Sequence, residues 1–107
     1  MIRVVYRWHL EPGSELNFAR WWHERTVAIR EAQEGSLGSV LLRAPADPSL
    51  FVGIARWLNV EHLEAFRRTI GPIHVDGATL DSMEILDEID NLLVQDHEII
   101  EPTWKEA

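Results

Sequence analysis

The chain has no cysteine, which narrows the chemistry that its side chains can perform. Disulfide bonds, thiolate nucleophiles and zinc sites built on cysteine are all excluded. Long apolar runs are also missing, since no stretch reaches the roughly 18 residues that a membrane-spanning helix needs. The five histidines lack the i,i+4 spacing typical of a metal-binding helix, so we expect no dedicated metal site.

Basic residues are few, and their distribution is uneven. The net charge of −8 argues against nucleic acid or an anionic membrane as the main partner. The segment Val75–Pro102 holds nine acidic residues and no lysine or arginine, which favours a solvated acidic surface. No signal peptide is visible after Met1, so we expect a cytoplasmic protein. The length of 107 residues fits a single domain, 1–107.

Apolar and polar residues alternate over the first ten positions, and this predicts a strand over Ile2–Leu10. One face would carry Ile2, Val4, Tyr6, Trp8 and Leu10, and the other Arg3, Val5, Arg7 and His9. We expect the first set to contact helices and the second to point away from them.

A helix is predicted next, beginning after a cap at Ser14 and ending near Gln33. Its apolar stripe has Arg25 at its centre and otherwise consists of Phe18, Trp21, Trp22, Ile29 and Ala32. Two apolar, β-prone runs follow, Ser39–Ala44 and Leu50–Trp57. They flank a proline-containing loop, which is typical of a hairpin.

After Trp57, the chain is predicted to be mainly helical. Asn59 is expected to cap a helix over Val60–Thr69, which Gly71 and Pro72 would end. A third helix would begin at Asp76 or Thr79 and end near Asp90. The final strand would begin at Leu92–Val94, with Ile99–Ile100 as a continuation or a short fifth strand.

This order of elements predicts an α+β, ferredoxin-like β-α-β-β-α-(α)-β domain with an antiparallel sheet. Helices would cover one face of the sheet, yet the hairpin strands are apolar on both faces. A second copy packed sheet against sheet would cover the other face, so we expect a homodimer. The C-terminal tail, about 99–107, would touch the partner subunit.

Several motifs resemble those of the antibiotic biosynthesis monooxygenase (ABM) family. They are Glu-Pro-Gly at 11–13, Phe18 and Trp22 in the helix, Gly-Ser-Leu-Gly-Ser at 35–39, and Phe51 before Ala-Arg-Trp at 55–57. The similarity covers about residues 2–70. It implies the dimeric α+β barrel fold and a small apolar pocket between helices and sheet. It also implies oxidation of a phenolic, polyketide-type compound without metal, flavin or haem.

The resemblance implies a set of site residues. The pocket walls would come from Tyr6, Trp8, Trp22, Trp57 and Phe66, and the substrate anion would be held by Arg25. Either His62 or His74 would transfer the proton, and His74 is favoured because it lies in a loop beside the expected pocket. The aromatic residues could equally be core residues, and Arg25 could extend its guanidinium into solvent.

Two other functions remain open from the sequence. Haem-degrading members of the family resemble one another in having Asn, Trp and His at three positions. The corresponding positions here hold Tyr6, Phe66 and His74. Only the histidine matches, so haem binding through His74 stays an alternative to oxygenase activity. The third reading is a ligand-binding or structural dimer without catalysis.

Overall fold

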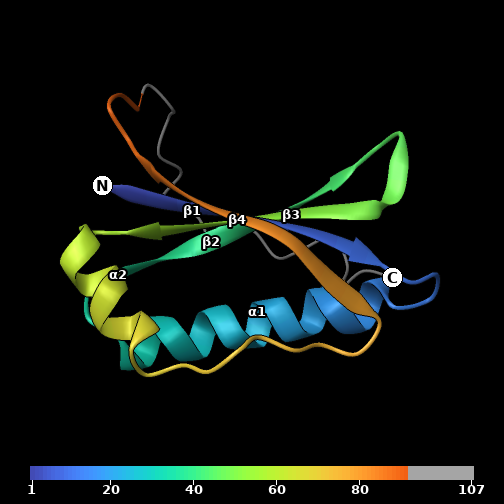
Figure 1. The fold of residues 1–107 in the computed structure, drawn as a ribbon, viewed down its shortest axis with the longest axis horizontal. Helices are drawn as coiled ribbons and strands as arrows, with labels where there is room; N and C mark the ends of the chain where they lie inside the picture. The colour runs from blue at the N-terminus through green and yellow to red at the C-terminus, as the bar shows by residue number, and fades with distance from the viewer. Residues whose placement is uncertain (92–107) are drawn as a thin grey trace.

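The computed structural model describes residues 1–91 as a four-stranded antiparallel sheet with two helices on one face (Figure 1). The elements follow in the order β1 (Ile2–Leu10), α1 (Glu15–Ala32), β2 (Ser36–Ala44), β3 (Asp47–Trp57), α2 (Val60–Arg67) and β4 (Ala78–Asp87). The strand order across the sheet is β2-β3-β1-β4. This arrangement confirms the predicted ferredoxin-like α+β fold.

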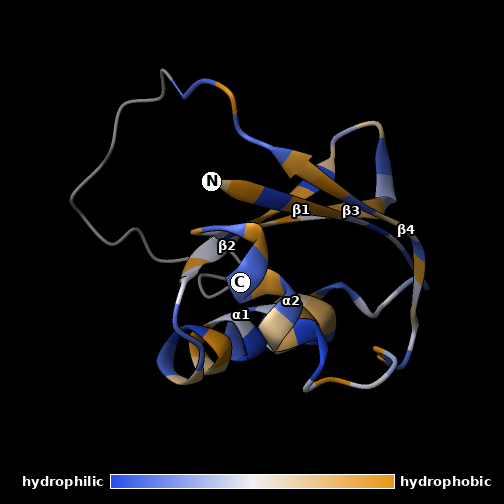
Figure 2. Ribbon diagram, turned by 60° about the vertical axis from the view of Figure 1, so that its left-hand side comes forward, coloured by the Kyte–Doolittle hydropathy of each residue, from blue (hydrophilic) through white to orange (hydrophobic). Residues whose placement is uncertain are grey.

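The sheet has one face covered by helices and one open face, and the side chains of the inner strand β1 alternate between them. Its even-numbered residues point to the helices, as their alternation predicts, and Val4 and Trp8 are only 1% exposed. Figure 2 shows hydrophobic residues along β1 and β3, with both helices beneath the same face. Two core clusters form there, one around Val4, Trp57 and Leu63 and the other around Trp8 and Phe18. Tyr6 packs against both clusters.

The two predicted helix caps differ in the structure. Asn59 precedes α2, and its side-chain oxygen accepts a hydrogen bond from the His62 backbone N–H at 2.9 Å. Ser14 precedes α1 but makes no side-chain cap bond. The helices end at Ala32 and Arg67, close to the predicted ends.

The β2–β3 hairpin is longer than the sequence predicts. Its strands extend until only Pro45 and Ala46 separate them, so the expected five-residue loop is largely part of β3. The side chain of Asp47 holds the start of β3, since its carboxylate accepts hydrogen bonds from the Ser49 backbone N–H at 3.1 Å and hydroxyl at 2.6 Å. These bonds hold the pKa of the Asp47 carboxyl below its ordinary value.

The predicted third helix is wrong, because residues 78–87 form strand β4 beside β1. Leu80 and Met83 suggest a helix by their spacing, yet both face the helices. A bulge explains this: Trp8 pairs with Leu80 and Arg7 with Ser82, so one extra residue, Asp81, interrupts the alternation. The predicted strand from Leu92 and the Ile99–Ile100 run lie outside the described residues.

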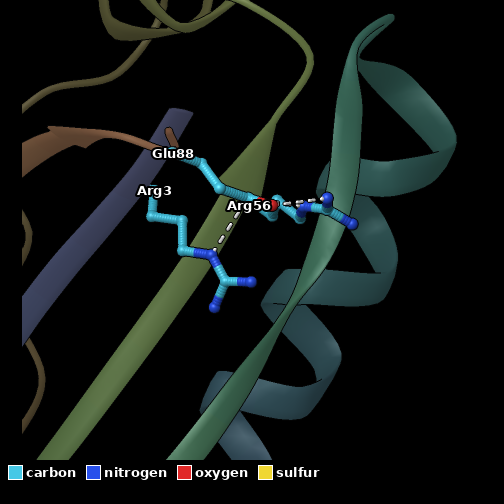
Figure 3. A network of polar contacts seen from close by, with 3 residues as sticks. All are labelled: Arg3, Arg56 and Glu88. Atoms are coloured by element: carbon cyan, nitrogen blue, oxygen red, sulfur yellow. Dashed lines mark hydrogen bonds and ion pairs between the residues drawn. The ribbon is translucent and has the colours of Figure 1, made fainter. Parts of the chain in front are cut away.

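The open face of the sheet combines apolar residues with paired charges. Arg3 Nε and Arg56 Nη2 each donate a hydrogen bond at 3.1 Å to the Glu88 carboxylate, which is 8% exposed (Figure 3). Desolvation raises the pKa of this carboxyl, but the two arginines outweigh that effect and hold the pKa below its ordinary value. Arg7 lies 3.8 Å from Glu84 (Nε to Oε1), also on this face.

Candidate functional site

A small aromatic cavity lies between α1, α2 and the covered face of the sheet. Its volume is about 50 Å³, enough for a few water molecules and well below the roughly 300–1,000 Å³ of a pocket that encloses a drug-sized ligand. Six of the eight predicted site residues line it, namely Tyr6, Trp8, Trp22, Arg25, Trp57 and Phe66. Trp57 and Phe66 stack on each other at one end, with ring centroids 5.2 Å apart.

Arg25 supplies the positive charge of the cavity. It lies one helical turn after Trp21 on α1, and its guanidinium carbon is 5.5 Å from the centre of the Trp21 ring system. No aspartate or glutamate belongs to the cavity wall, and no ion pair involving Arg25 is found within residues 1–91. Arg25 therefore offers an uncompensated charge to an anion that enters the cavity.

Tyr6 places a phenol group near this charge. Burial raises the pKa of the Tyr6 hydroxyl, and the positive charges of Arg25 and Arg67 offset this only in part. The hydroxyl thus remains protonated at neutral pH and is available to donate a hydrogen bond. Its ring meets Trp22 edge-on, with centroids 5.6 Å apart.

Trp22 forms a fixed wall of the cavity because three residues hold it. Its indole Nε1 donates a hydrogen bond to Ser39 Oγ at 2.9 Å, and Thr26 Oγ1 lies 2.8 Å from the same oxygen. Its ring lies directly over Gly53, where a Cβ atom would stand 2.3 Å from Trp22 Cη2. Thr26, Ser39 and Gly53 are not among the residues predicted from the sequence. A glycine inside an apolar strand is the signal that indicates such a close approach.

Trp8 belongs more to the core than to the cavity wall. It is 1% exposed and packs against Phe18 at 5.0 Å and Trp21 at 6.0 Å between ring centroids. Its buried indole N–H has no hydrogen-bond partner within the described residues. The sequence leaves open whether Trp8 is a core residue or part of the pocket wall. Most of its contacts are those of a core residue.

Neither candidate histidine reaches the cavity. The His62 ring hydrogen-bonds Asn59 Oδ1 at 2.7 Å and packs against Gly35, where a Cβ would lie 2.5 Å from its Cγ. The His74 side chain is 85% exposed and lies 3.2 Å from the Asp76 carboxylate (Nε2 to Oδ1). Among residues 1–91, therefore, no histidine lines the cavity.

The described part of the chain contains neither a group of metal-binding side chains nor a membrane-spanning helix. No group of three or more His, Asp or Glu side chains is arranged to hold a metal ion there. Between residues 1 and 91, no helix has the length and apolar character needed to cross a membrane.

Comparison with known proteins identifies the family. The family model for antibiotic biosynthesis monooxygenases matches residues 1–71. Comparison with curated protein sequences gave no match. Among solved structures, the haem degrader MhuD of Mycobacterium tuberculosis is 17% identical, with a TM-score of 0.66, and the alignment covers 86% of this chain and 99% of MhuD.

A second similar structure is SnoaB, a cofactor-independent oxygenase from Streptomyces nogalater. It is 18% identical, with a TM-score of 0.55, and the alignment covers 85% of this chain and 95% of SnoaB. At such low identity, both structures support the fold alone. The family model spans well over half of the chain. The protein therefore belongs to the antibiotic biosynthesis monooxygenase family.

Proposed function

We propose that this protein is a cofactor-independent monooxygenase that binds a small phenolic compound as its anion. The observation that carries the proposal is that Arg25 and Tyr6, whose hydroxyl is protonated, both line an aromatic cavity whose wall holds no carboxylate. A guanidinium and a phenol donor at an apolar wall favour a planar oxyanion over a neutral or cationic ligand.

These residues would act by stabilising the substrate anion. A phenolate or enolate near Arg25 gains a charge-assisted interaction, and Tyr6 donates a hydrogen bond to the same oxygen. Both effects lower the pKa of the bound substrate and increase the fraction of it that is ionised. The anion is electron-rich enough to reduce oxygen. One oxygen atom would become a new carbonyl group of the quinone product, and the other would leave as water. The substrate itself supplies the electrons.

The positions of the two candidate histidines limit how the substrate can lose its proton. Because His62 and His74 lie away from the cavity wall, neither is in place to accept a proton from a bound phenol. The substrate therefore loses its proton to solvent, before or during entry past half-buried Arg25. This favours acidic phenols, whose anion is already populated in solution, over simple phenols.

The structure supports haem binding less well. MhuD is a haem degrader, but His74, the candidate haem ligand of this chain, is largely solvent-exposed. The cavity wall of the described region instead offers Tyr6, whose phenol stays protonated. Haemin is still a useful probe, because a shifted Soret band on titration would identify the haem-binding alternative directly.

Replacement of Arg25 tests the proposed function. We expect Arg25→Met to weaken binding of 1-naphthalenesulfonate at least tenfold, measured by tryptophan fluorescence, with a similar loss of oxygen uptake on anthrone, whose oxidation to the quinone adds one carbonyl oxygen and releases water. The matched control is Arg20→Met, an exposed arginine of the same helix, which should leave both unchanged. Equal behaviour of the two variants would refute the anion site. Binding without oxygen uptake in the wild-type protein would establish the non-catalytic alternative.

We further propose that the protein acts as a homodimer formed through the open face of the sheet. This face exposes apolar side chains of β2 and β4, including Val40 at 45%, Leu42 at 48% and Leu86 at 48%. The charges beside them are already paired within the protomer, as Arg3 and Arg56 are with Glu88. A face that is apolar and internally neutralised can be buried without leaving isolated charges.

A further inference from the structure

The volume of the interior cavity poses a problem for its proposed ligand. A pocket that encloses a drug-sized ligand measures roughly 300–1,000 Å³, several times the cavity volume of about 50 Å³. Some neighbouring space must therefore be joined to the cavity when a multi-ring compound binds.

That space lies immediately beside the cavity, in an open groove of about 460 Å³ along α1. Four residues, Trp21, Arg25, Ile29 and Phe66, line both the groove and the cavity. The two hollows therefore share a wall.

Two small side chains form part of the groove. Ala28 and Ala32 both line it, and their i,i+4 spacing places them one above the other on α1. Both are exposed, and the polar side chains of Glu24 and Gln33 line the groove as well. Ala28 and Ala32 therefore form a strip of small apolar side chains in the same groove as Arg25.

The shared wall can move more easily than the rest of the site. Trp22 is held by Ser39 and by the backbone of Gly53. Trp21 and Arg25 are only partly buried, and the guanidinium stacks on the indole without an ion pair to hold it among the described residues. Partly exposed side chains change rotamer rapidly, so separation of this pair would join the cavity to the groove.

We propose that the groove over Ala28 and Ala32 is a second binding subsite, which takes a planar apolar extension of the anionic aromatic ligand. The acidic end of the ligand lies at Arg25, its first ring system occupies the cavity once Trp21 and Arg25 have separated, and a further ring rests on the alanine strip. This inference depends on the proposed anion site at Arg25. It adds a preference for compounds with more rings than the cavity alone can hold.

Two related probes separate the subsites. 1-Naphthalenesulfonate carries the anion and one ring system, and 8-anilinonaphthalene-1-sulfonate carries the same group with an additional phenyl ring. We expect Ala28→Leu to weaken binding of the anilino compound at least fivefold, because the leucine fills the groove. Binding of 1-naphthalenesulfonate should change less than twofold. Ala65→Leu, at an exposed position of α2 outside both hollows, should affect neither probe.

The outcomes distinguish the two proposals. If Ala28→Leu leaves the anilino compound unaffected, or weakens both probes equally, the second subsite is refuted. If 1-naphthalenesulfonate binds equally well to Arg25→Met and wild type, the anion site itself is wrong. Leucine is compatible with an exposed helical position, and an unchanged melting temperature will confirm that Ala28→Leu is folded. Ala32→Leu provides a second variant with the same expected pattern.

Discussion

Gly53 shows how one residue without a side chain shapes the candidate site. It pairs with Tyr6 across the sheet, and the Trp22 ring occupies the space where its side chain would be. The close approach brings the benzene ring of the indole against the strand while its N–H reaches Ser39. One wall of the cavity can therefore form only because residue 53 has no side chain.

Gly53→Ala should therefore destabilise the protein by about 1–3 kcal/mol, because the new methyl group would overlap the Trp22 ring. Urea denaturation measures this loss. The control is Gly71→Ala, where the new methyl carbon would meet no heavy atom within 4 Å, and we expect a change below about 0.5 kcal/mol. Equal stability of the two variants would show that Trp22 is not held against the sheet.

At the residue scale, the sequence predicts cavity residues well where they lie on regular elements. Tyr6 and Trp8 follow from strand alternation, and Trp22 and Arg25 follow from the helical stripe. The prediction of His74 rests on its chemistry and its position in a loop. Local periodicity does not determine the direction of a loop side chain, and the structure leaves His74 in solvent beside Asp76.

At the scale of elements, the N-terminal ends of the two helices can be compared directly. Residue type predicts both Ser14 and Asn59 as N-caps, but only Asn59 makes the side-chain bond. Residue type identifies where a helix begins. It does not fix the backbone angles that bring the side chain to the first free N–H groups.

Asn59→Ala should destabilise the protein by about 1 kcal/mol, because the His62 N–H loses its partner at the start of α2. Ser14→Ala should change stability by less than about 0.5 kcal/mol, since no cap bond is lost. Thermal or urea unfolding of the two variants in parallel provides the comparison. Losses of equal size would contradict the assigned difference between the caps.

Strand β4 marks the limit of prediction from periodicity. Acidic residues and apolar residues three apart are typical of an amphipathic helix, and residues 78–87 have both. The bulge at Asp81 produces this spacing within a strand, and the bulge itself depends on pairing with β1. A pattern that arises from a partner strand is not visible in the local sequence.

At the scale of the whole molecule, the open face of the sheet determines the expected assembly. Val52 lies on this face, paired with Arg7 of β1 and Leu42 of β2. We expect the wild-type protein to sediment as a dimer at micromolar concentration. Val52→Asp should sediment as a monomer, because it buries an unpaired carboxylate in the interface.

Leu16→Asp is the matched control for this experiment. Leu16 is 49% exposed and lies on α1, on the opposite side of the sheet, so its replacement should leave the dimer intact. A wild-type protein that sediments as a monomer would refute the dimer. Dissociation by both variants would place the interface elsewhere.

The position of β1 at the centre of the sheet also bears on how the chain folds during synthesis. This strand is made first, yet its neighbours are residues 50–57 and 78–87. Such distant pairings slow folding, because long loops must close before any contact forms. A chain interrupted before Ala78 would leave one edge of β1 unpaired, and an open apolar edge invites pairing with other chains. Premature termination should therefore yield an aggregation-prone fragment and not a smaller stable domain.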